Sequence, residues 1–240
     1  MILNEGFKEK EVFGMINRLR KCKQALRKFI EKVLAPIRRS KLNSTNFTII
    51  SNNCWAGRVY QRYGLSYTSP TVGLFFWAED YVRFISKLRY YMSLEISMIP
   101  ATESKHYDML VKRNQLPCPV GKLDDVEVVF LHYKTDKEAI EKWERRKKRI
   151  NWDNLYIKFS MMNCCAEEHL DVFKDIDYEA KVVFVNNKEL TKKGDCFVFV
   201  PGFEYSEDID NDTNHYADYF DINYFLNNKK ILVRKTPKMK

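Results

Sequence analysis

Short apolar segments of strand character alternate with helical segments along most of the chain, and this alternation constrains the fold most strongly. Strands that are apolar on both faces and are joined through helices form mostly parallel sheets. We therefore predict a three-layer, Rossmann-like α/β fold, in which a mostly parallel sheet is covered by helices on both faces. The expected strands are 47–51, 71–76, 94–99, 126–132, 155–159, 181–185 and 196–200, the expected helices are 56–63, 78–92, 137–150 and 166–176, and residues 201–228 are expected to be loop.

A basic amphipathic segment precedes this domain. Residues 9–35 place apolar side chains at helical spacing and Arg and Lys on the other face, which predicts one helix that Pro36 ends or kinks. Such a helix can lie on an anionic membrane surface, or it can pack on its own domain or on a second copy of the chain in a homo-oligomer. The predicted organisation is a basic helix and linker over 1–41, an α/β domain over 42–228 and a basic tail over 229–240.

The positive charge of the chain lies at its ends. Of the formal net charge of +9, residues 1–41 carry 12 basic against 4 acidic side chains, and residues 229–240 carry 6 basic and no acidic ones. The segment between them is therefore net acidic, and nucleic acid is not an expected partner. The sequence shows neither a long apolar run nor a signal peptide. We expect a cytoplasmic protein, or one held on the inner leaflet of the cell membrane through residues 9–35.

Cysteine spacing and glycine motifs limit the cofactor classes. The six cysteines include no C-x-x-C pair, which argues against a disulfide framework and against a zinc site, so no metal is expected. The glycine signatures of dinucleotide-binding and P-loop proteins are missing from the sequence. The sequence therefore names no cofactor.

Polar clusters follow four of the expected strands, at 51–54, 132–135, 160–165 and 186–188. Ligands in open α/β sheets bind beyond the carboxyl ends of the strands. Cys54 opens a helix, where the macrodipole and free backbone N–H groups favour a thiolate, so it is a candidate nucleophile with His132 as its base. The alternative is that Cys54 is a small buried residue beside a helix cap at Asn53, and that His132 is a half-buried histidine bonded to a loop.

Two further residues are candidate ligand groups. Arg149 abuts the apolar stripe near the end of the 137–150 helix, where its planar fork could clamp a phosphate or a carboxylate. His169 follows Cys165 by four residues on one helical face, and we place it with the substrate-binding candidates because a metal site from that pair alone lacks a third ligand.

Three segments carry a resemblance to a known family: S-N-N-C-W-A-G-R-V-Y through residue 76, W-E-R-R-K-K-R-I-N-W-D-N over 143–154, and K-F-S-M-M-N-C-C-A-E-E-H-L over 158–170. Together they resemble an uncharacterised bacterial family, a domain of unknown function associated with exopolysaccharide and capsule biosynthesis, over about residues 45–200. The resemblance implies an α/β fold and a setting in surface-polysaccharide assembly. The strand–Asn-Cys–helix opening is also similar, more loosely, to cysteine-bearing polysaccharide acyltransferases.

This chain departs from the family pattern at two places. The resemblance leads us to expect a glycine where Ala56 stands and a charged Asp-Arg-Asn where Met161, Met162 and Asn163 stand, so activity could be altered or lost here.

The expected function is that of a transferase of the acyl or glycosyl type, acting on a glycan or its activated precursor. Cys54 and His132 would carry the chemistry, and Ser51, Asn52, Asn53 and Asn163 would bind the sugar. The alternative is a non-catalytic adaptor of the polysaccharide machinery at the membrane surface, bound through the basic helix.

Overall fold

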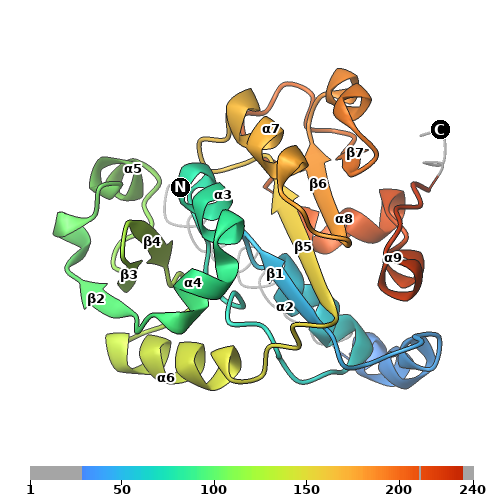
Figure 1. Cartoon of the computed structure of the whole chain (residues 1–240), viewed down its shortest axis with the longest axis horizontal. Coiled ribbons are helices and arrows are strands. Elements are labelled where there is room, and N and C mark those ends of the chain that lie inside the picture. The colour runs from blue at the N-terminus through green and yellow to red at the C-terminus, as the bar shows by residue number, and fades with distance from the viewer. Residues whose placement is uncertain (1–28, 211, 235–240) are drawn as a thin grey trace, which may run out of the picture.

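The computed structural model describes residues 29–210 and 212–234, and its centre is a four-stranded parallel sheet (Figure 1). The strands are β1 (Thr48–Ser51), β5 (Leu155–Ser160), β6 (Lys181–Val185) and β7 (Phe197–Phe199), in the spatial order β1-β5-β6-β7. Thr48 lies opposite Leu155, and Ile157 lies opposite Lys181, so neighbouring strands run in one direction. The predicted parallel sheet is confirmed.

Helices cover both faces of this sheet. On one face, Ile50, Ile157, Phe159 and Val183 pack against α3 (Ala78–Ser86) and α7 (Glu167–Asp175). On the other face, the alternate strand residues Ile49, Tyr156, Val182 and Phe184 pack against α2 (Trp55–Tyr63), α8 (Asp212–Tyr219) and α9 (Ile222–Asn228). Because both sets of strand side chains are buried, the three-layer prediction is confirmed.

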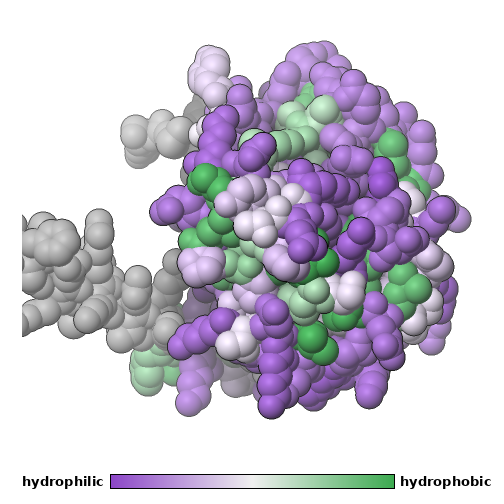
Figure 2. Space-filling model, turned by 90° about the vertical axis from the view of Figure 1, so that its left-hand side faces the viewer, coloured by the Kyte–Doolittle hydropathy of each residue, from purple (hydrophilic) through white to green (hydrophobic). Residues whose placement is uncertain are grey.

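A second, antiparallel sheet lies within the long connection between α2 and β5. Its strands are β2 (Ser97–Ile99), β3 (Val120–Leu123) and β4 (Val126–Val129), and it is accompanied by α4 (Leu88–Ser93), η1 (Ala101–Glu103), α5 (Tyr107–Lys112) and α6 (Asp136–Lys147). The side of the molecule that carries α5 and β2 is mostly hydrophilic, with scattered apolar patches (Figure 2).

In this connection two strand predictions are correct only in part and one is wrong. The segments 94–99 and 126–132 contain only the short β2 and β4, which belong to the antiparallel sheet. The segment 71–76 is a turn with a single bridge from Phe75 to Val129. β3 escaped prediction because its V-G-K-L sequence has little strand character, and it pairs with β4 around Asp124 at φ 55°.

The helix predictions also need correction. The segment 78–92 is two helices, α3 and α4, because Lys87 between them has an extended φ of −132°. Residues 201–228 are not loop throughout, since they contain α8 and α9, and η2 (Lys188–Lys193) precedes β7. Of the predicted 9–35 helix, residues 9–28 lie outside the described part. Residues 29–39 are helical and continue through Pro36, so of the two alternatives at Pro36 the helix end is wrong.

Among the described residues, no helix combines the length and the apolar character that crossing a membrane requires.

Candidate functional site

The polar residues at the end of β1 form a buried hydrogen-bond network with the end of β5 and the start of α2. The Ser51 hydroxyl donates to the Asn53 carbonyl at 2.7 Å and accepts the Ala56 N–H at 3.3 Å, which starts α2. The Asn52 side chain accepts the Ser160 N–H at 2.9 Å and donates to the Ser160 carbonyl at 3.0 Å, which continues the pairing of β1 with β5. Ser51, Asn52 and Asn53 are buried, so their hydrogen bonds hold the strand ends together.

A fully buried ion pair, Lys158 with Asp212, lies beneath this turn. The Lys158 ammonium donates to Asp212, to the Ser160 hydroxyl and, at 3.1 Å, to Asn53 Oδ1. The Asn53 amide in turn donates to both Asp212 oxygens, at 3.1 and 3.2 Å. Burial lowers the pKa of Lys158, and the Asp212 carboxylate opposes this shift. The cluster anchors α8 to the carboxyl ends of β1 and β5.

The predicted ligand groups Asn163, His169 and Arg149 lie elsewhere. Asn163, at φ 57°, donates from its side chain to the Phe76 carbonyl and accepts from Arg113, both within a buried turn. His169 Nδ1 accepts the Ala166 N–H at 2.9 Å and so caps α7. Arg149 is exposed and donates to the Tyr67 carbonyl at 3.5 Å.

Cys54 and the exposed His132 both line an open cleft of about 330 Å³ beside the carboxyl end of β1. Both bond the backbone of the same segment: the His132 N–H donates to the Gly73 carbonyl at 3.1 Å, and the Cys54 thiol donates to the Leu74 carbonyl at 4.0 Å. We call this cleft the Cys54 cleft. Its lining residues are Cys54, Gly57, Arg58, Gln61, Tyr67, Val72, Gly73, His132, Tyr133, Lys142 and Arg146.

Two glycines allow the walls of the Cys54 cleft to approach. A Cβ at Gly57 of α2 would lie 3.0 Å from Val72 Cγ1, so a side chain there would push the two walls apart. Gly73 has φ 84°, and a Cβ there would lie 3.1 Å from the Tyr133 ring. The close contact of α2, the 69–76 segment and Tyr133 therefore requires both glycines.

The chemistry of the cleft combines a neutral thiol with excess positive charge. Burial raises the pKa of the Cys54 thiol, and Arg58 only partly opposes this shift, so the thiol needs a base to become a nucleophile. Burial also raises the pKa of the Tyr133 hydroxyl. Arg58, Lys142 and Arg146 line the cleft, and within the described part of the chain no Asp or Glu does so. The arrangement suits an anionic ligand.

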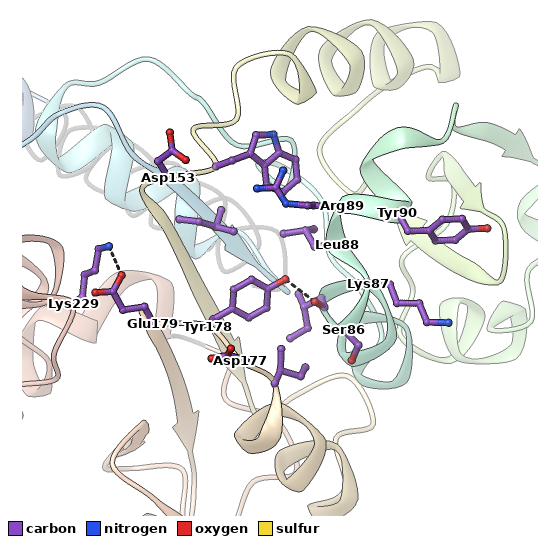
Figure 3. A pocket seen from close by; sticks show the side chains of 14 residues that line it. Ser86, Lys87, Leu88, Arg89, Tyr90, Asp153, Asp177, Tyr178, Glu179 and Lys229 are labelled. Carbon is purple, nitrogen blue, oxygen red and sulfur yellow. Dashed lines mark hydrogen bonds and ion pairs between the residues drawn. The ribbon is translucent and has the colours of Figure 1, made fainter.

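A larger pocket of about 500 Å³ lies at the opposite end of the strands, by the amino ends of β5 and β6 (Figure 3). Three of its charged side chains and one tyrosine hydroxyl are already engaged. Arg89 stacks on the Trp152 ring at 4.4 Å, Lys229 pairs with Glu179, and Tyr178 donates to the Ile85 carbonyl at 2.7 Å. No cluster of three metal-ligating side chains occurs among residues 29–210 and 212–234. The Cys54 cleft is therefore the stronger candidate site.

Sequence reasoning missed Arg146 and Lys158. Arg146 follows the buried Ala139 and Trp143 by seven and three residues, so it shares their helical face, and this spacing was the available signal. Lys158 interrupts a strand that is buried on both faces, where a charged side chain requires a partner. That partner, Asp212, gives no signal in the sequence.

Comparisons with known proteins identify the family of the chain. A family model described as "Domain of unknown function (DUF1919)" matches residues 25–231. A protein of Haemophilus influenzae named "Uncharacterized protein" is 28% identical over 193 residues, which cover 79% of this chain and 84% of that relative. The match to the family model spans both sheets, so the chain belongs to the DUF1919 family.

Proposed function

We propose that this protein is a transferase of surface-polysaccharide biosynthesis, which acts in the Cys54 cleft on a glycan or its activated precursor. The observation that carries the proposal is that Cys54 and His132, from distant parts of the sequence, line one cleft beside the carboxyl end of β1. Most of the cleft lining, including Arg146, comes from segments 51–76 and 143–154, which carry the resemblance to the polysaccharide-associated family.

Of the two proposed reactions, acyl transfer is the one for which a cysteine thiol is better suited. His132 takes the proton of the Cys54 thiol, and the thiolate attacks the carbonyl carbon of an acyl donor, forming a carbon–sulfur bond. The donor's leaving group departs with the proton held by His132. A sugar hydroxyl then attacks the thioester, transfers its proton to His132 and releases the Cys54 thiolate. In the glycosyl version, the same cleft binds the activated sugar, and His132 is the base for the acceptor hydroxyl.

The departures from the family pattern leave this machinery in place. Met162 contacts the buried hydrogen-bond network at the end of β1, since its sulfur accepts from the Asn53 amide at 3.3 Å. It does not line the Cys54 cleft. Ala56 is buried inside α2. Neither position removes a group that the proposed reaction uses.

The test is a transfer assay with coenzyme A thioesters and nucleotide sugars as donors. We expect Cys54→Ala and His132→Gln each to lower the rate at least about 100-fold, since a positioned base alone contributes about that factor. Cys196→Ser, a half-buried cysteine outside the cleft, is the matched control and should keep the activity of the original protein. Full activity in Cys54→Ala would exclude Cys54 as the nucleophile.

A second candidate is an adaptor bound to an anionic membrane surface, and the helical residues 29–39 favour it. Phe29, Val33 and Ile37, spaced by four residues, are 66%, 53% and 57% exposed and form one apolar stripe. Basic side chains of the same segment flank this stripe. An amphipathic helix of this kind binds lipid by burying its apolar face beside anionic headgroups.

Flotation with vesicles that contain phosphatidylglycerol tests this candidate. The full chain should float at low salt, and binding should fall with added salt and in Val33→Asp/Ile37→Asp. If the full chain stays in the unbound fraction at low salt, the adaptor function is excluded.

A further inference from the structure

We propose that the Cys54 cleft recognises a phosphate group of its substrate through the buried guanidinium of Arg146. The inference rests on the proposed function, because it takes this cleft as the substrate site. It adds the substrate class: a small phosphate ester, such as a sugar phosphate or the phosphate head of a lipid-linked sugar.

Arg146 is a buried cation whose partners among the described residues are all neutral. It is 6% exposed, and its Nη1 donates to the Val72 carbonyl at 2.8 Å and to the Tyr133 hydroxyl at 2.5 Å. Its guanidinium also stacks on the Tyr67 ring at 5.1 Å. All three partners are neutral, and among the described residues no carboxylate pairs with Arg146.

This arrangement favours an anionic ligand. Withdrawing one ion from water costs several kcal/mol, which proteins normally offset with an opposite charge. The neutral partners of Arg146 occupy only Nη1, so within the described structure Nε and Nη2 have no hydrogen-bond acceptor. Those two nitrogens form the side of the guanidinium fork that binds phosphate or carboxylate through two parallel hydrogen bonds.

A second unpaired cation favours a phosphate over a singly charged group. Arg58 is exposed at the cleft, and its one hydrogen bond among the described side chains goes to Gln61 at 3.4 Å. Lys142 also lines the cleft, but its charge is balanced by the ion pair with Glu138. Arg146 and Arg58 together carry two positive charges, which one carboxylate would not balance, whereas a phosphate ester carries up to two negative charges.

The size of the cleft limits the rest of the ligand. At about 330 Å³, the Cys54 cleft is near the lower end of the roughly 300–1,000 Å³ range of small-molecule sites. A phosphorylated monosaccharide suits this volume. The thiol and His132 then lie in the same cleft as the phosphorylated sugar.

Isothermal titration calorimetry with a hexose 1-phosphate tests the inference. We expect binding to the original protein and to Arg149→Gln, the matched control with an exposed arginine on the same segment. Arg146→Gln should bind at least about tenfold more weakly, since charge-assisted paired hydrogen bonds are lost. Arg58→Gln should weaken binding by a smaller factor, and as an exposed position it keeps the test valid if Arg146→Gln fails to fold.

A short-chain polyprenyl phosphate in micelles is titrated in parallel. Tighter binding of the polyprenyl phosphate indicates a lipid-linked substrate, and tighter binding of the hexose 1-phosphate indicates a soluble one. Equal affinity in Arg146→Gln and the original protein, or no binding of either phosphate to the original protein, overturns the inference. The outcome is independent of the transfer assay. Phosphate binding that needs Arg146, together with full activity in Cys54→Ala, refutes the proposed nucleophile and leaves the phosphate site standing.

Discussion

Replacement of Asp212 by alanine should destabilise the protein strongly, because it leaves the Lys158 ammonium buried without its counter-charge. Both side chains are fully buried, and without Asp212 the ammonium keeps only the Asn53 and Ser160 oxygens. Removing one partner of a buried ion pair typically costs about 3–5 kcal/mol of unfolding free energy. In a chain of this length, 1 kcal/mol shifts the melting temperature by about 2–4 °C, so we expect a fall of about 6–20 °C.

The assay is urea unfolding followed by circular dichroism, with the exposed Asp210→Ala as the control. The double variant Lys158→Met/Asp212→Leu should recover most of the loss, because it replaces both charges with apolar groups. A loss below about 1 kcal/mol in Asp212→Ala, or no recovery in the double variant, would refute the structural role of the pair.

The pH dependence of Asp212→Ala provides a second readout. Burial lowers the pKa of Lys158 from its ordinary value of 10.5. Between the lowered pKa and 10.5, the unfolded chain binds the proton that the folded protein has released, so stability rises with pH in that window. Without Asp212 the depression is larger, because the opposing carboxylate is gone. The destabilisation of Asp212→Ala should therefore shrink as pH rises toward 10.5.

Three other substitutions probe the strand ends, the core and the cleft. Asn52→Ala should lower the unfolding free energy in urea by about 2–4 kcal/mol, because it leaves the buried Ser160 N–H and carbonyl without their side-chain partner; an unchanged urea midpoint would contradict this. Burial raises the pKa of Tyr60 from 10.0 to about 12, so its contribution is present below pH 10 and is lost between pH 10 and about 12. Tyr60→Phe should thus flatten the alkaline fall in melting temperature, and an identical fall would argue against that burial. Gly73→Ala combines strain of about 1–2 kcal/mol with crowding of Tyr133 and should weaken hexose phosphate binding; Gly202→Ala, at φ 89° with open space around it, is strained alike and should leave binding unchanged.

The parallel sheet was predictable because its strands are apolar on both faces and so cannot be confused with surface elements. Ile49 and Ile50 pack into opposite cores, as do Val182 and Val183. The antiparallel pairing was not predictable, since β2 and β3 are short and half polar, and β2 pairs only with β3, which in turn pairs with β4. Helix α8 was missed because its anchor, Asp212, depends on a lysine 54 residues earlier in the chain.

Only the part of the candidate site that follows β1 was predictable from the sequence. The position of Cys54 after a buried strand indicated that a ligand binds beyond that strand's carboxyl end, and His132 lines the same cleft. The neighbouring asparagines looked equally suitable, but their side chains satisfy the backbone of Ser160 and the Asp212 carboxylate, which sequence patterns do not reveal. Arg149 lies three positions after Arg146, in the turn that follows α6, whereas Arg146 lies within α6 and packs against Tyr67 and Tyr133.

Ligand protection of Cys54 from alkylation, quantified by peptide mass spectrometry, tests most directly whether this cleft binds the substrate. The exposed Cys164 serves as the control within the same sample, because it lies outside the cleft. A phosphorylated sugar should slow alkylation of Cys54, leave Cys164 unchanged, and lose its effect in Arg146→Gln. Alkylation of Cys54 at an unchanged rate, at a ligand concentration that saturates binding, would contradict the account.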